Sequence, residues 1–311
     1  MMPIEPPPIP VSRPLLPRFE QLEQYLRTID QARYYTNHGQ LHDLLQCRIS
    51  GHYHIGTDCI ALSSSGTSGL IGTILATVGY ATNDRPLCIC PAHTFVATAI
   101  AARACGYVPF LADVDEDSWA LHPEQLIEIP ELQNASLVLV AAPYGRQPDL
   151  ASWQRFQRTS GLPVIIDAAA CFDGLPARTI SEGRIPAVVS LHATKTLSTA
   201  EGGLIIGPPD IVSRVVRALN FGFCDSRDSV GPSINGKMSE YHAAIGLADL
   251  DAWDNKRRGF IASARNYSST TRSAGLDSRI AVMENCANPY ALFAAGSAKE
   301  GAAVTLPRFL I

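Results

Sequence analysis

The sequence predicts an α/β fold in which helices flank a mostly parallel sheet. Two observations support this class. Short apolar runs bounded by turn residues alternate with helical patterns, which is the order of elements in a parallel sheet with crossover helices. The chain also has 311 residues, of which 46% are hydrophobic and 17% charged. A chain of about this size buries roughly three quarters of the surface it exposes when unfolded, so it can form a large core.

Seven apolar runs are the expected strands, and all of them are short and bounded by turn-forming residues: 59–62, 86–90, 108–112, 136–142, 163–167, 187–191 and 203–207. Four segments between them have helical patterns and are the expected crossovers: 67–79, 94–105, 123–129 and 149–159. Pro123 suits the first turn of its helix, where a missing N–H costs nothing.

The link between the sixth and seventh strands is different, because it has only 11 residues, 192–202. A parallel crossover usually needs a dozen or more, so we expect the seventh strand to run antiparallel to the sixth. Beyond it we expect a helix near 210–219, a loop rich in Gly, Ser and Asp at 222–236, and one long helix over about 239–258.

Charge and hydropathy exclude several classes of function. The net charge is −4, from 25 Lys and Arg against 29 Asp and Glu, with no block of like charges. A nucleic-acid partner is not expected, because binding one needs clustered basic side chains. No apolar run approaches the 18 or more residues of a membrane span, and the Pro-rich residues 1–17 lack the pattern of a secretory leader. We therefore expect a soluble, cytoplasmic protein without a membrane partner.

The eight cysteines lie mostly inside apolar stretches. In a cytoplasmic chain a disulfide framework is not expected. The one CxC pair lies in an expected strand and lacks the paired spacing of a zinc site, so no metal is predicted. The cysteines are interpreted as small apolar core residues.

The run SSSGTSG at 63–69 follows an expected strand and opens an expected helix. Backbone N–H groups and hydroxyls converge there, where the helix dipole favours an anion, so a phosphate could bind. The run is neither a Walker loop nor a GxGxxG motif. A Ser/Gly helix cap without a ligand explains it equally well.

Two charged residues follow buried strands. Asp167 ends the run VIID, at the strand end where open α/β sheets bind ligands; a helix cap is the alternative. Lys195 lies in a short turn between two strands that are expected to be buried. A lysine in apolar surroundings loses its proton readily and suits Schiff-base chemistry, whereas a solvated surface charge is the ordinary interpretation. A phosphate site, an anion and an amine at strand ends together are what pyridoxal 5′-phosphate (PLP) requires.

Eight segments in order resemble the PLP-dependent sugar aminotransferases of the DegT/DnrJ/StrS family, over about residues 14–267. They are YTNHG (35–39), SGT (65–67), PAHTFVAT (91–98), FLADVD (110–115), YGRQP (144–148), DAA (167–169), SLHATK (190–195) with EGG (201–203), and NGKMSE (235–240) before AAIG (243–246). The resemblance implies a fold-type-I PLP-dependent transferase with a mostly parallel seven-stranded sheet. It further implies a large PLP-binding domain at 1–250 and a small, shortened C-terminal domain at 251–311.

By this resemblance Lys195 forms the Schiff base with the cofactor and moves the proton. Asp167 is the partner of the pyridinium nitrogen. Gly66, Thr67 and Ser68 are the phosphate-binding turn, and Ser190 is a second phosphate contact.

The resemblance also assigns two residues outside these turns. Phe95 corresponds to the aromatic residue that stacks on the cofactor ring, although an ordinary core Phe is the alternative. Asn235 corresponds to the residue that reaches the phosphate of the neighbouring subunit's cofactor, which implies a homodimer with shared active sites.

The activity implied is transfer of an amino group from an amino acid, expected to be glutamate, to the keto group of a nucleotide-linked sugar, as in polysaccharide biosynthesis. Relatives that dehydrate sugars have His in place of the catalytic lysine, so Lys195 favours transamination. Ala170 and Lys237 depart from the family, which usually has Gln or His and Arg there. Ala170 and the shortened C-terminal domain make a non-catalytic or impaired PLP-binding protein with a truncated C-terminus the alternative function.

Three histidines lie near the expected site. His192 is interpreted as a strand-end residue hydrogen-bonded to the backbone, with a general acid as the alternative. His38 and His93 are interpreted as loop residues without an assigned role.

Overall fold

The computed structural model describes residues 13–224, 226–276, 280–294 and 296. Much of the expected Pro-rich N-terminal segment and much of residues 276–311 lie outside the described residues. The division into domains at residue 250 therefore stays a prediction.

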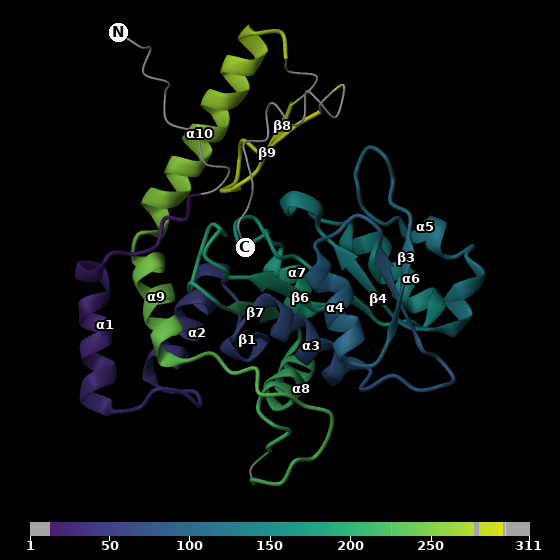
Figure 1. Ribbon diagram of the computed structural model, residues 1–311, viewed down its shortest axis with the longest axis horizontal. Coiled ribbons are helices and arrows are strands. Elements are labelled where there is room, and N and C mark those ends of the chain that lie inside the picture. The colour runs from purple at the N-terminus through teal and green to yellow at the C-terminus, as the bar shows by residue number, and fades with distance from the viewer. Residues whose placement is uncertain (1–12, 225, 277–279, 295, 297–311) are drawn as a thin grey trace, which may run out of the picture.

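A seven-stranded sheet in the order β1-β7-β6-β5-β4-β2-β3 forms the centre of the fold (Figure 1). Its strands are β1 (Ile60–Ser63), β2 (Leu87–Pro91), β3 (Val108–Ala112), β4 (Ala135–Ala141), β5 (Val164–Asp167), β6 (Ala187–Ser190) and β7 (Gly203–Ile206). Strands β2 to β6 pair in parallel, and β7 is antiparallel to both β6 and β1. All seven predicted strands and the predicted reversal of the last one are confirmed.

Helices cover both faces of the sheet and enclose two apolar cores. One core contains side chains of α3 (Gly66–Thr77), α4 (Val96–Ala104) and α8 (Pro209–Leu219). The other contains side chains of α1 (Phe19–Ala32), α2 (Gln40–Tyr53), α5 (Pro123–Leu126), α6 (Leu150–Ser160), α7 (Ala177–Glu182) and α9 (Glu240–Asp251). Short 3₁₀ turns lie at Thr57–Cys59, Pro130–Asn134 and Pro143–Gly145. The four predicted crossover helices are confirmed as α3 to α6.

The prediction of a single long helix over 239–258 is wrong. This segment forms parts of two helices, α9 and α10 (Trp253–Ser273), which meet at Ala252. The break lets the Trp253 ring turn into the core, where its centroid lies 4.9 Å from that of Phe172. Beyond the break α10 extends away from the sheet, beside the two-stranded hairpin of β8 (Ile280–Val282) and β9 (Ala291–Phe293) (Figure 1).

A buried ion pair fastens this helix junction to the turn that carries Lys195. The Asp249 carboxylate accepts hydrogen bonds from Lys256 Nζ at 2.6 and 2.8 Å and from the Ser198 backbone N–H at 2.9 Å. The Asp249 side chain is 1% exposed. Burial raises the pKa of Asp249, and the Lys256 charge opposes that rise.

Lys256→Ala is expected to lower the free energy of unfolding by about 3 kcal/mol, because it leaves a buried carboxylate without its cation. Denaturant unfolding of the variant measures this loss. Arg178→Ala is the matched control: it also removes an ion pair, with Glu182, but both side chains are exposed. Its unfolding midpoint should equal that of the wild type within error, and an equal loss in both variants would contradict the role given to burial.

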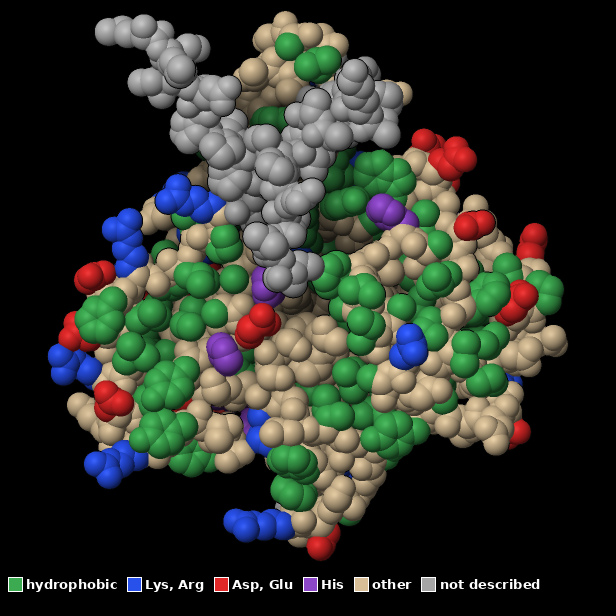
Figure 2. All heavy atoms as spheres, in the orientation of Figure 1, with side chains coloured by type: hydrophobic (Ala, Val, Ile, Leu, Met, Phe, Trp, Pro, Cys, Tyr) green, Lys and Arg blue, Asp and Glu red, His purple; other side chains and the backbone are tan. Residues whose placement is uncertain are grey.

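Within the described part of the chain, no helix has both the length and the apolar character to cross a membrane. Figure 2 shows one side of the molecule, on which acidic and basic side chains are interspersed and many of them lie near the rim. The cytoplasmic location stays a prediction.

Candidate active site

The predicted site residues meet at the carboxyl ends of neighbouring strands. Asp167 ends β5 and Ser190 ends β6, and these two strands are paired in parallel. Helices α3 and α4 begin near the same edge, since Gly66 packs against Ser190 and Thr98 bonds to Asp167. Ligands of open α/β sheets bind at this edge, so the topology places the candidate site where the sequence predicts it.

The serine-rich turn is a capped helix start. Ser65 Oγ accepts from the Ser68 N–H at 3.0 Å, and Ser68 Oγ accepts from the Ser65 N–H at 2.9 Å, which makes a reciprocal cap. A Cβ on Gly66 would lie 3.1 Å from the Cβ of Ser190. The turn and Ser190 are thus adjacent, and Thr67 begins the same helix turn. An anion could bind here, because the N–H groups of the first turn of a helix have no carbonyl partners within the helix and point outward from its N-terminus.

Asp167 is a buried carboxyl group held by hydrogen bonds. Its Oδ2 accepts from Thr98 Oγ1 at 2.6 Å, and its Oδ1 accepts from the Ala169 N–H at 3.3 Å. Burial raises the pKa of Asp167, whereas these two bonds and the Lys195 charge act to lower it. The ionised form of a buried carboxyl group is stabilised by a nearby positive charge. A protonated ring nitrogen would supply that charge.

Lys195 lies in the half-buried turn between β6 and β7 rather than on an open surface. Its Nζ donates a hydrogen bond to the hydroxyl of Tyr290 at 3.0 Å. Its charge also acts on Asp167, so the two residues share one electrostatic environment. The structure therefore brings together the amine and the anion that the sequence predicts.

His192 in the same turn is hydrogen-bonded to the backbone, as expected. Its Nδ1 accepts from the Thr194 N–H at 3.3 Å, and its Nε2 lies 3.6 Å from Glu201 Oε1.

Phe95 is 77% exposed at the N-cap of α4, so the alternative of an ordinary core Phe is wrong. Asn235 is also exposed, and its Oδ1 accepts from Lys237 Nζ at 2.8 Å. The carbonyl of the next residue, Gly236, accepts from the Ser64 N–H at 2.7 Å. Asn235 therefore lies next to the serine-rich turn of its own chain. Its reach toward a partner's site stays a proposal.

Two segments of the family pattern, YTNHG and NGKMSE, turn out to contact each other. The buried Glu240 carboxylate accepts from the N–H groups of Leu41 and His42, at 2.8 and 3.0 Å, and so caps α2. Gly39 passes so close to this carboxylate that a Cβ there would collide with it. The contact explains these residues structurally. His38 stacks edge-on against His42 and remains without an assigned role.

Sequence reasoning missed two residues of the site, Thr98 and Tyr290. Thr98 lies inside PAHTFVAT, one helical turn after Phe95, so its position was visible although its bond to Asp167 was not. Tyr290 lies in a segment without a recognisable pattern, and its contact with Lys195 spans 95 residues of sequence.

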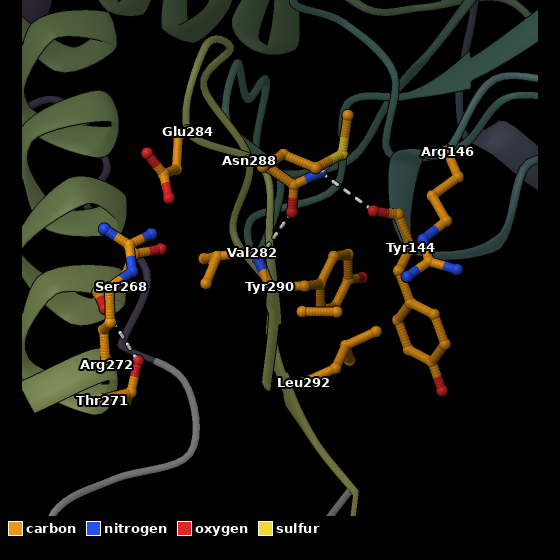
Figure 3. Close-up of a pocket in the computed structure, with 12 residues that line it drawn as sticks. Tyr144, Arg146, Ser268, Thr271, Arg272, Val282, Glu284, Asn288, Tyr290 and Leu292 are labelled. Carbon is orange, nitrogen blue, oxygen red and sulfur yellow. Dashed lines mark hydrogen bonds between the residues drawn. The ribbon is translucent and has the colours of Figure 1, made fainter. Parts of the chain in front are cut away.

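A cavity of about 220 Å³ lies between α10, the β8–β9 hairpin and the turn at Tyr144 (Figure 3). Tyr290 lines the cavity and is bonded to Lys195, so the cavity adjoins that lysine. Arg146 and Arg272 line it from opposite sides, together with one acid, Glu284. The Arg146 guanidinium stacks 5.0 Å from the Trp119 ring. Two guanidinium groups that face one cavity suit a ligand that carries phosphate or carboxylate.

Comparison with known proteins gives consistent matches over most of the chain. Residues 19–300 match the model of the DegT/DnrJ/EryC1/StrS aminotransferase family. Protein Rv3402c of Mycobacterium tuberculosis is 30% identical over 289 residues, which cover 90% of this chain and 68% of the relative. The dTDP-4-amino-4,6-dideoxy-D-glucose transaminase of Shigella dysenteriae is 32% identical over 255 residues, or 81% of this chain and 67% of that enzyme.

A solved structure shares the fold. The crystal structure of a Bacillus cereus protein assigned as a PLP-dependent aminotransferase matches with a TM-score of 0.79 and 27% identity. The match covers 91% of this chain and 78% of that one.

Proposed function

Since the chain belongs to the DegT/DnrJ/EryC1/StrS aminotransferase family, we propose that it binds PLP and aminates the keto group of a nucleotide-linked sugar. The amino donor is an amino acid, glutamate in our proposal. The family membership agrees with the resemblance that the sequence motifs indicate. The observation that carries the proposal is that a half-buried Lys195 lies near enough to the buried Asp167, at the end of β5, for its charge to act on that carboxyl group.

Each part of the cofactor has residues that suit it. The α3 turn of Gly66, Thr67 and Ser68, with Ser190 beside it, would hold the phosphate. Asp167 would keep the ring nitrogen protonated, and Phe95 would cover one face of the ring. When bound, PLP carries the amino group between substrates and accepts the electron pair left on the substrate carbon.

The protein's own groups handle the protons. Lys195, once its amine is free, would act as the base that removes the proton from the donor carbon and then as the acid that returns it. Asp167, oriented by Thr98, would supply the negative charge that a protonated ring nitrogen needs. In the net reaction the donor's amino group ends on the sugar carbon, so amino acid and keto sugar become keto acid and amino sugar. Water supplies the carbonyl oxygen of the keto acid, and the ketone oxygen of the sugar leaves as water.

A homodimer is part of this proposal. Phe95, Val96 and Ile100 expose 77%, 58% and 47% of their surface along one side of α4. An apolar patch next to the site suits a second copy of the chain. Asn235, exposed beside the serine-rich turn, would then complete the partner's phosphate site.

The alternative of an impaired PLP-binding protein is not favoured, because the family's amine and anion are both present and lie in one site. Single-turnover amination of a panel of keto-sugar nucleotides by the PLP-loaded protein, after glutamate, tests the function. One amino sugar per site is expected from at least one member, and no product from any keto sugar would contradict it.

Arg272 gives a prediction about the sugar substrate, since it lines the cavity and its guanidinium makes no hydrogen bond or ion pair within the described residues. Arg272→Ala is expected to raise the KM for the anionic sugar nucleotide about tenfold, the cost of one partly exposed charge-assisted contact. The kcat should change little. Arg265→Ala, on the same helix but outside the cavity lining, is the control and should stay within about twofold of wild type. An unchanged KM in Arg272→Ala would remove this cavity from the substrate site.

A further inference from the structure

Tyr290 contacts the lysine that carries the chemistry, and we propose that it is a positioning residue for the Lys195 amine. The inference rests on the proposed function. The phenol oxygen lies 3.0 Å from Lys195 Nζ, and the ammonium lies 5.5 Å from the centroid of the ring. Within the described residues, Lys195 Nζ makes no other hydrogen bond or ion pair. The direction of this amine is therefore set by one hydroxyl group.

Tyr290 is itself held in place through its backbone and its ring. Its backbone N–H donates to Asn288 Oδ1 at 2.8 Å, and Asn288 Nδ2 donates to the Tyr144 carbonyl at 2.9 Å (Figure 3). The Tyr290 ring packs edge-on against the Tyr144 ring, with centroids 5.5 Å apart and an interplanar angle of 77°. A hydroxyl on so constrained a ring can hold a flexible partner.

The segment that carries Tyr290 is anchored to the sheet domain at a second point. The Asp173 carboxylate accepts from the Ala287 N–H at 2.6 Å and from Arg257 Nε at 2.8 and 3.0 Å. The Asp173 side chain is 8% exposed. The segment 287–290 is thus held beside the turn of Lys195, so a part of the chain distant in sequence contributes to the site.

The bond reduces the number of positions that the Lys195 amine samples. A lysine side chain has about 2 kcal/mol of rotamer entropy, and an untethered amine samples many positions. The hydrogen bond to Tyr290 restricts Nζ to the region from which the amine, once it has lost its proton, can attack an aldehyde or take a proton. The hydroxyl is bonded to the amine, so its loss should slow the chemistry. The ring lines the cavity, and a substitution that keeps the ring should leave substrate affinity nearly unchanged.

Tyr290→Phe tests this, since it removes the hydroxyl and keeps the ring packing. The matched control is Tyr267→Phe on α10, a half-exposed tyrosine. Cofactor-free proteins are mixed with PLP, and the rate constant of capture is taken from the growth of visible absorbance, with Lys195→Ala as the blank. Tyr290→Phe is expected to capture PLP about tenfold more slowly and to lose about tenfold in kcat, with KM for both substrates within about twofold. Tyr267→Phe should match wild type.

Two further measurements separate positioning from folding. Thermal unfolding of Tyr290→Phe should stay close to wild type, and Asn288→Ala, which keeps the hydroxyl but releases its support, should show intermediate slowing. If wild-type protein captures PLP and Tyr290→Phe captures it equally fast with an unchanged kcat, the positioning role is overturned while the proposed function stands. If wild-type protein gives no more absorbance than Lys195→Ala, the proposed function fails and the positioning role fails with it.

Discussion

Lys195→Ala is expected to abolish the visible absorbance of the PLP-loaded protein and to lower kcat about 10⁴-fold. The variant loses both the amine that binds the cofactor covalently and the base that moves the proton, and each role contributes strongly to rate. The half-buried turn that carries Lys195 is held by Asp249 through Ser198, so the fold should survive the change. Absorbance spectra and steady-state rates measure the loss, and circular dichroism checks the fold.

Rescue by a small amine separates chemistry from structure in this variant. Methylamine is small enough to enter the space left by the lysine side chain, and it should restore part of the rate in proportion to its concentration. A folded Lys195→Ala protein that keeps wild-type turnover would exclude Lys195 as the catalytic amine.

Asp167→Asn is expected to lower kcat about a thousandfold, because it removes the negative charge and nearly preserves the shape. The amide can still accept the bond that Thr98 donates, so the geometry of the floor of the site is retained. Stopped-flow measurement of the half-reaction with glutamate gives the loss. Asp173→Asn is an unsuitable control, since Asp173 anchors Arg257. Asp43→Asn, on an exposed carboxylate of α2, should leave turnover unchanged.

Asp167→Asn is expected to lower activity but to raise the stability of the cofactor-free protein at neutral pH. Burial raises the pKa of Asp167 in the folded protein. The folded state then binds this proton more tightly than the unfolded state, whose carboxyl titrates near pH 4. The contribution of Asp167 to the free energy of unfolding is therefore fully present below its pKa in the unfolded state. It is lost as pH rises through its higher pKa in the folded state. Cofactor-free Asp167→Asn should equal wild type near pH 4 and exceed it at neutral pH. A wild-type advantage at pH 7 without cofactor would show that burial does not dominate at Asp167.

Local patterns predicted the parts of this protein that depend on neighbours in sequence. The strand of Asp167 is visible in the sequence as three apolar residues followed by an acid. The short link at 192–202 predicted the direction of β7. The break at Ala252 contains no Pro or Gly, and it follows from Trp253 packing on Phe172 from another part of the chain.

The site divides in the same way. Lys195, Asp167 and the serine-rich turn follow strands or open helices, so their positions could be derived from the sequence. The bond of Thr98 to Asp167 and the bond of Tyr290 to Lys195 join segments far apart in the chain, and no local signal marks either. Only the fold reveals that the C-terminal segment reaches the lysine.

The half-reaction with glutamate shows directly whether Lys195 and Asp167 support transamination. PLP-loaded wild-type protein is mixed with glutamate without any acceptor, and visible absorbance and 2-oxoglutarate are followed together. We expect the visible band to disappear and one 2-oxoglutarate to form per site, with neither change in Lys195→Ala. A stable visible band, with no keto acid from glutamate or from any other amino acid, would contradict an aminotransferase built on Lys195 and Asp167.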